Sequence, residues 1–249
     1  MRNILPLIIA FILCSAFGDR PSRDKYRIKT ITQYWRNDSS VSEYSYNADG
    51  YILQVKNSKG NDIGYEYLDG RILRRYYDAL RQLSFVDTLT LDKDKHVVRV
   101  ASNNRSILSE TRVYEANAHP IRTVQIDSAG KEMSIAEVQY KNGDKMVDTR
   151  SRTNGNLWYS SSYQYYTDHA NTIGEENMGS EFVGKGSAHL VKYESRQMVG
   201  TPPVNTKYSY RYDEKGRVLS RTGYDVSTGR QTDSAVYSYY SGVQVLLEK

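Results

Sequence analysis

The amino-acid sequence predicts an all-β fold, an antiparallel meander of about sixteen strands that is closed or strongly curved. Three observations support this prediction. Tyrosine makes up 23 of the 249 residues. Val, Ile, Thr and Tyr alternate with polar residues at the period of two that half-buried strands require. Turn motifs recur about every 24 residues, the length of two strands and two turns.

Two segments that align without a gap define the repeated hairpin. Residues 44–53 and 210–219 each carry tyrosines at alternate positions, then Asn or Asp, then a glycine. The side chain of Asn47 can accept hydrogen bonds from the backbone of its own turn, and Gly50 can adopt the positive φ that the turn needs. We therefore expect a tyrosine-lined strand, a tight turn and a returning strand in each unit.

Two shorter turns and one irregular segment complete the pattern. Asp69-Gly70 and Asn142-Gly143 predict two-residue type I′ turns. Residues 171–186 contain four glycines and break the alternation. We interpret this segment as a loop or short helix inserted at one sheet edge, with a binding loop on a rigid scaffold as the alternative.

The first residues predict export. Residues 4–13 are apolar, follow Arg2 and precede small residues, as in a signal peptide. We expect residues 1–18 to be removed and 19–249 to form a single domain in the periplasm, at the outer-membrane surface or secreted. Lipidation of Cys14, the only cysteine, is the alternative and would add a lipid anchor. Under either interpretation the folded part has no disulfide.

Charge and hydropathy limit the partners. The net charge is only +5, and the basic residues are dispersed, so we expect no nucleic-acid partner. The mean hydropathy is −0.68, and no later run approaches the roughly 20 apolar residues of a transmembrane helix.

In residues 206–212 one face of the expected strand is tyrosine and the other is Lys207, Ser209 and Arg211. This alternation favours a soluble barrel over one facing lipid. Residues 71–77 form a basic aromatic cluster that could contact lipid headgroups or acidic glycans.

The hairpin motif resembles known families. Residues 210–219 resemble a unit of the YD-repeat (Rhs-type) proteins, whose strands coil into extracellular β shells. Residues 44–240 resemble a Bacteroidota family of exported proteins of unknown function with a porin-like fold. This resemblance implies a barrel, an export or lipoprotein signal, and no assigned activity or catalytic residue. The hairpins near Asn117 and Asp168 keep the spacing but lack the Gly-Arg pair.

No motif indicates catalysis, so we expect no enzyme, no cofactor and no metal. The histidines lie far apart, lack the spacing of zinc ligands and are predicted to lie on the surface: His96, His119, His169 and His189. Asp92, Asp94 and Asp127 could ligate calcium, but no twelve-residue acidic loop is present. We expect them to bond the backbone of their turns instead.

Two functions remain open. The first is a binding module, in which aromatic rings form a platform for a glycan or peptide beside the irregular segment: Trp158, Tyr159, Tyr163, Tyr165 and Tyr166. The second is a structural or assembly role in the cell envelope, through contacts with other envelope proteins. The sequence does not predict the oligomeric state.

Overall fold

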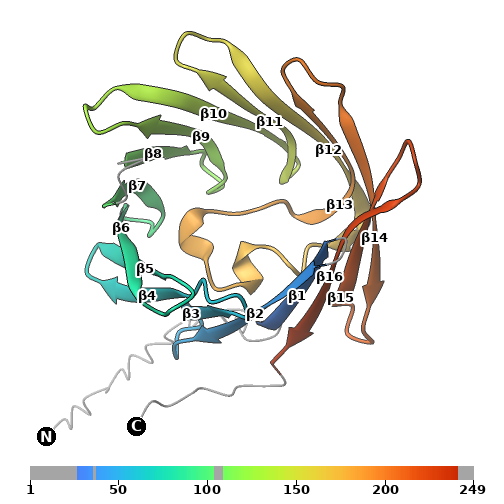
Figure 1. Cartoon of the computed structure of the whole chain (residues 1–249), viewed down its shortest axis with the longest axis horizontal. Helices are drawn as coiled ribbons and strands as arrows, with labels where there is room; N and C mark the ends of the chain where they lie inside the picture. Colours follow the sequence, from blue (N-terminus) through green and yellow to red (C-terminus); the bar gives the residue numbers. More distant parts are fainter. Residues whose placement is uncertain (1–26, 36–37, 104–108, 241–249) are drawn as a thin grey trace, which may run out of the picture.

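The protein is a closed antiparallel barrel of sixteen strands, in which each strand pairs with its neighbours in sequence. The computed structural model describes residues 27–35, 38–103 and 109–240. The first strand pairs with the last and closes the cylinder (Figure 1). The predicted fold class is thus confirmed, and the barrel is closed. The predicted signal peptide (residues 1–18) and Cys14 lie outside the described residues.

The strands run in chain order around the barrel. They are β1 (Ile28–Trp35), β2 (Asp38–Tyr46), β3 (Ile52–Asn57), β4 (Ile63–Leu68), β5 (Arg71–Tyr77), β6 (Leu83–Leu91), β7 (Val97–Ser102), β8 (Ser109–Tyr114), β9 (Pro120–Ile126), β10 (Glu132–Lys141), β11 (Asp144–Arg152), β12 (Leu157–Ala170), β13 (His189–Met198), β14 (Val204–Tyr212), β15 (Val218–Asp225) and β16 (Gln231–Tyr239). Two 3₁₀ turns, η2 (Glu175–Asn177) and η3 (Glu181–Val183), lie between β12 and β13. No helix in this described part is long and apolar enough to cross a membrane.

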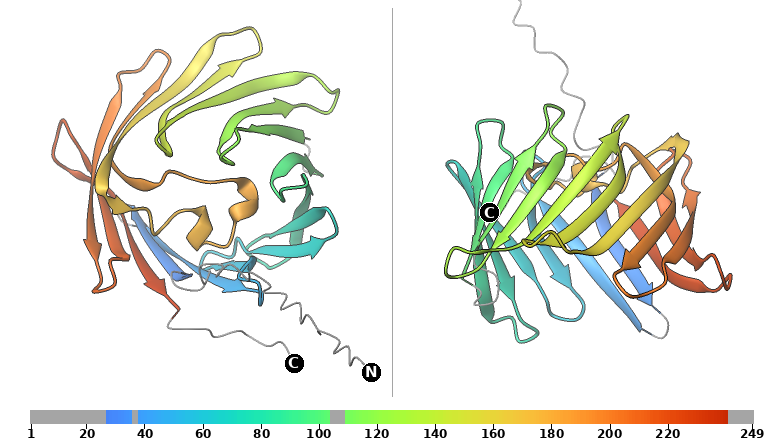
Figure 2. Two further views of the ribbon diagram at one scale, coloured as in Figure 1. Left: turned by 180° about the vertical axis from the view of Figure 1, so that it is seen from behind. Right: turned by 90° about the horizontal axis from the view of Figure 1, so that it is seen from above.

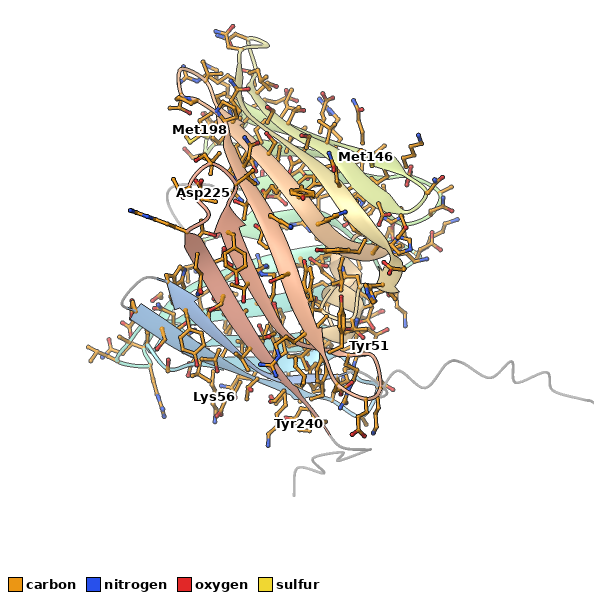
Figure 3. The ribbon with its side chains drawn as sticks, turned by 90° about the vertical axis from the view of Figure 1, so that its right-hand side faces the viewer. Tyr51, Lys56, Met146, Met198, Asp225 and Tyr240 are labelled. Carbon is orange, nitrogen blue, oxygen red and sulfur yellow. The ribbon has the colours of Figure 1, made fainter. Side chains whose placement is uncertain are left out.

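The two sets of turns occupy opposite ends of the barrel. Figure 3 shows Tyr51 and Tyr240 at one end and Met198 and Asp225 at the other. The strands are tilted across the barrel wall (Figure 2). The repeated tyrosine-rich turns found in the sequence all belong to the first of these two ends.

The inner face of the barrel carries the buried residues. Because paired residues share a face, the pairing of buried Ile31 with buried Tyr237 and of Ile72 with Leu89 defines the inward positions. Two clusters of buried apolar residues result, one built on β1, β13, β15 and β16 and the other on β3 and β5–β7. Lys207, Ser209 and Arg211 are exposed, as the alternation in β14 predicts.

The turn chemistry follows the sequence in most positions. The Oδ1 atom of Asn47 accepts hydrogen bonds from the backbone N–H groups of Asp49 and Tyr51, at 3.1 and 2.9 Å. The equivalent carboxylate of Asp213 does the same in the last repeat. Asn142 and Gly143 both have positive φ, 54° and 81°, as a type I′ turn requires.

One turn prediction is wrong. In Asp69-Gly70 only the glycine has a positive φ, 65°, so this turn is not type I′. Asp92 and Asp127 bond the backbone of their turns as expected. The Oδ1 atom of Asp92 accepts the backbone N–H groups of Asp94 and His96, both at 2.9 Å. The Oδ1 atom of Asp127 accepts two backbone N–H groups of its own turn in the same way.

The irregular segment folds into the barrel. Residues 171–188, which we call the plug, contain η2 and η3 and lie across the interior at one end (Figure 1). The expectation of an insertion at a sheet edge is wrong, because a closed barrel has no edge strand. We call the two ends the plug end and the open mouth.

Candidate functional site

The plug is hydrogen-bonded to strands and turns on several sides of the barrel. Its Gly179 carbonyl accepts the backbone N–H of Ile52 at 3.0 Å. On the far side its Lys185 N–H donates to the Ala118 carbonyl at 2.9 Å. The Thr172 hydroxyl accepts the backbone N–H of Val218 at 3.0 Å. These contacts satisfy backbone groups that would otherwise be left unpaired inside the barrel.

An ion pair and an aromatic contact hold the middle of the plug. Arg27, which is 3% exposed, donates to the Glu176 carbonyl and, through Nη2, to Glu181 Oε1 at 3.1 Å. Phe182, which is 4% exposed, packs on the rings of Tyr65 and Tyr67, with centroids 6.0 and 6.3 Å away. The plug is therefore a packed part of the core.

A cavity of about 420 Å³ lies between the plug and the wall of β10–β15. The plug contributes Asn171 and residues 173–175 and 183–187, and the strands contribute mostly tyrosines and charged side chains. The wall residues on which the following argument rests are Lys145, Tyr163, Tyr165, Glu194, Tyr208 and Arg221. We call this space the lumen cavity.

The polar groups of the lumen cavity are fixed by one another. Glu194 accepts the Tyr208 hydroxyl at 2.9 Å and the Arg196 guanidinium at 2.8 Å. Arg221 donates to Asp233 at 2.8 Å, while its buried Nε has no hydrogen-bond partner among the residues that the structure describes. This atom has almost no accessible surface and lies behind the cavity wall, whereas the guanidinium of Arg221 lines the cavity with its Cζ 5.2 Å from the ring centroid of Tyr208.

Burial keeps the phenols of the cavity protonated. It raises the pKa of Tyr165 to about 12 and holds the pKa values of Tyr163 and Tyr208 still further above their usual value. The dominant cause in each case is loss of hydration, which disfavours the phenolate. At neutral pH these hydroxyls can donate and accept hydrogen bonds beside apolar ring faces, an arrangement suited to polar ring-shaped ligands.

The five aromatic residues predicted to bind a ligand separate into three groups. Tyr163 and Tyr165 line the lumen cavity. Tyr166 packs near Tyr210, with ring centroids 6.0 Å apart. Trp158 and Tyr159 lie 6.1 Å from each other near the open mouth and do not line this cavity. They do not form one continuous platform.

The histidines serve as packing groups. His119 is only 6% exposed, so its predicted surface position is wrong. It stacks on Tyr140 at 4.3 Å, and its Nδ1 lies 3.1 Å from the Lys185 carbonyl of the plug. His96 and His169 also stack on tyrosines. His189 Nδ1 lies 2.8 Å from the Asp144 carboxylate. Within the described ranges, no three His, Cys, Asp or Glu side chains could together hold a metal ion.

The sequence alone does not indicate the two charged side chains of the site, Glu194 and Arg221. Glu194 and Arg221 enter it because their strands pair in register with Tyr163 and Tyr210. The predicted meander gives the order of the strands but not the register between them, so this proximity is not visible in the sequence. The basic aromatic cluster at residues 71–77 is also divided, because Arg74 turns inward to Asp87 at 2.6 Å while Arg75 pairs with Glu66.

Structural comparison finds barrels of the same kind. A crystal structure of a porin-like protein from Bacteroides uniformis ATCC 8492 matches with a TM-score of 0.68 and 16% identity, over 86% of this chain and 98% of that chain. One from Bacteroides vulgatus ATCC 8482 matches with a TM-score of 0.60 and 13% identity, over 86% and 99%. No known family description and no curated protein sequence matches the chain. The two similarities show a shared porin-like fold.

Proposed function

We propose that this protein is an exported, non-catalytic binding module of the cell envelope that takes a glycan or peptide into the lumen cavity. The observation that carries the proposal is the cavity of about 420 Å³, walled by Tyr163, Tyr165 and Tyr208 and closed below by the plug. Cavities of this size accommodate small ligands or the end of a longer chain.

The chemistry of the wall favours a glycan. Sugar rings offer an apolar face that packs on tyrosine and hydroxyl groups that hydrogen-bond with charged side chains. Glu194 supplies hydrogen-bond acceptors and the guanidinium of Arg221 supplies donors beside the rings. Because both groups are held by neighbours, little side-chain entropy is lost on binding.

A glycan array followed by calorimetry tests the proposal. We expect Tyr163→Ala to weaken binding of the captured glycan at least tenfold, because one ring face is lost. Tyr193→Ala is the matched control, since Tyr193 faces outward against exposed Lys207. If no glycan or peptide binds, or if both variants bind as the unmodified protein does, the proposal is wrong.

Export is part of the same proposal, and it rests on the apolar stretch at residues 4–13. The repeated hairpins that resemble YD repeats support an extracellular or periplasmic shell. Mass spectrometry of the mature protein tests it. A chain that begins at Asp19 supports cleavage, a diacylated Cys14 supports the anchored alternative, and an intact Met1 would contradict export.

The open mouth favours a second candidate, a structural role through contact with an envelope protein. Fourteen large apolar side chains of the described residues are exposed, and eleven of these lie in or beside the turns of the open mouth. They are Tyr34, Trp35, Leu80, Leu83, Met133, Leu157, Met198, Val199, Val204, Tyr224 and Val226. Exposed apolar patches of this kind mark protein contacts.

Cross-linking in cells distinguishes this second candidate. Leu80→Glu and Val199→Glu place charges on the apolar rim and should abolish a defined cross-linked partner. Val113→Glu is the control, because Val113 is exposed beside the plug end. A protein that stays monomeric in cross-linked cells would contradict the structural role.

A further inference from the structure

A second hollow continues the lumen cavity toward the open mouth. It measures about 210 Å³ and is lined by seven inward residues of β8–β11, which include Arg112, Gln125, Ser134 and Arg150. On β10, Val138 lines the lumen cavity and Ala136 lines this hollow. Since these are successive inward positions of one strand, the two spaces adjoin along the same wall.

The register explains why a hollow exists here. Arg112 pairs with Thr123, Thr123 with Ala136, and Ala136 with Arg150. The two arginines therefore flank two small side chains across four strands. With strands about 4.8 Å apart, their backbones are separated by about 14 Å. This width suits one sugar ring and its substituents.

The charge of the hollow is positive. Five inward carboxylates around the barrel are each paired with a basic side chain, in the pairs Arg74–Asp87, Arg112–Glu110, Lys145–Asp148, Arg196–Glu194 and Arg221–Asp233. Arg150 belongs to no ion pair of the described residues and lies 5.5 Å above the ring of Tyr159. Two guanidinium groups and one carboxylate give the hollow a net charge of +1, which matches a singly charged anion better than a dianionic phosphate.

We infer that the ligand is a saccharide carrying single negative charges, a carboxylate or a sulfate ester, and that Arg150 binds this charge in the hollow. The inference rests on the proposed function and names its ligand class. The neutral sugar rings of this saccharide lie on Tyr163 and Tyr208 in the lumen cavity. Arg150 can form two parallel hydrogen bonds to the anionic group. The Ser134 hydroxyl, which donates to Gln125 Oε1 at 2.7 Å, can accept a ligand hydroxyl beside it.

An array of uronate-containing, sulfated and neutral oligosaccharides tests the inference, followed by calorimetry with the bound sugar. We expect the bound members to be anionic. Methyl esterification of a bound uronate removes its charge and should lower its affinity to that of a neutral oligosaccharide. Arg150→Ala should lower the affinity for anionic ligands at least tenfold, and Arg150→Lys should lower it less. Added sodium chloride should weaken binding to the unmodified protein more than to Arg150→Ala. Uronates and sulfates on the array show which anionic group is preferred.

Arg99→Ala is the matched control. It removes the same charge from β7, where Arg99 is exposed and faces outward. If neutral members bind as tightly as anionic ones, or if Arg150→Ala and Arg99→Ala behave alike, this inference is wrong while the proposed glycan function stands. If no saccharide binds at all, the proposed glycan function fails as well.

Discussion

At the residue scale, one small arrangement recurs at the plug end and explains the abundance of tyrosine. The last residue of a turn packs against a tyrosine of the next strand, and the hydroxyl of that tyrosine donates to the carbonyl of the buried residue that follows the turn. Three hairpins share this arrangement. Tyr51, His96 and Arg217 pack against Tyr67, Tyr114 and Tyr239, respectively. The hydroxyls of these three tyrosines donate to the carbonyls of Ile52, Val97 and Val218, in the same order. Tyrosine fits because one side chain supplies both a packing face and a donor.

The hydroxyl should contribute measurably to stability. Tyr67→Phe keeps the ring but removes the 2.8 Å hydrogen bond to the Ile52 carbonyl. We expect a loss of about 1 kcal/mol in the free energy of unfolding, because a buried carbonyl loses its partner. Urea denaturation measures this. Tyr34→Phe, at an exposed tyrosine, is the control, and an equal effect of both variants would contradict the role of the hydroxyl.

Alkaline pH should destabilise the barrel. Burial raises the pKa of Tyr44 and of Tyr239 to about 12, whereas the unfolded chain ionises near 10. Above pH 10 the unfolded state therefore binds fewer protons than the folded state, so stability falls as pH rises. The contribution is fully present below pH 10 and is lost progressively between pH 10 and about 12. Circular dichroism and phenolate absorbance should change together. If all 23 tyrosines ionise near pH 10 while circular dichroism still shows an intact barrel, the burial argument is wrong.

These residue-scale features were partly predictable. The sequence indicates the Asn47 and Asp213 turns because an acceptor side chain and a glycine stand at fixed offsets. It does not indicate that His119 is buried, since the ring and the plug carbonyl that cover it come from Tyr140 and Lys185. Contacts between residues distant in the chain leave no local pattern.

At the element scale, the plug lies across the interior and closes one end of the barrel. Its 3₁₀ turns lack the length of a stable helix and are held by contacts with the barrel. The sequence shows where regular strands stop, because four glycines interrupt the alternation at residues 171–186. It does not show that the segment turns inward, because this depends on the Arg27 and Phe182 contacts that form only in the closed barrel.

Gly179 should be required for seating the plug. A Cβ at this position would lie 2.7 Å from the Gly50 carbonyl oxygen and 2.8 Å from the Ile52 nitrogen. We expect Gly179→Ala to destabilise the protein by about 1–3 kcal/mol beyond the cost of its positive φ. Gly130→Ala is the control, since Gly130 has a φ of +80° and nothing within 4 Å. Thermal unfolding compares them, and equal melting temperatures would contradict the close contact.

At the scale of the whole molecule, closure removes every free strand edge and leaves one open mouth. The repeated hairpins predict the number of strands and the pairing of neighbours. They do not decide between an open sheet and a closed barrel, because closure joins residues such as Thr30 and Ser238, whose hydroxyls lie 2.6 Å apart. The outward charged side chains, including the paired Glu43 and Lys56, occupy outer positions that the alternation predicts to be polar.

Residues 171–188 close the barrel from inside and form the floor of the lumen cavity. Hydrogen-exchange mass spectrometry of the plug tests this most directly, with the exposed open-mouth turn at residues 153–156, which contains no proline, as the internal reference. The backbone N–H groups of Lys185 and Ala188 donate to the carbonyls of Ala118 and Gly143 in the turns of the barrel, so we predict that the plug is protected nearly as well as the strands. A plug that exchanges as fast as the reference turn would contradict the account.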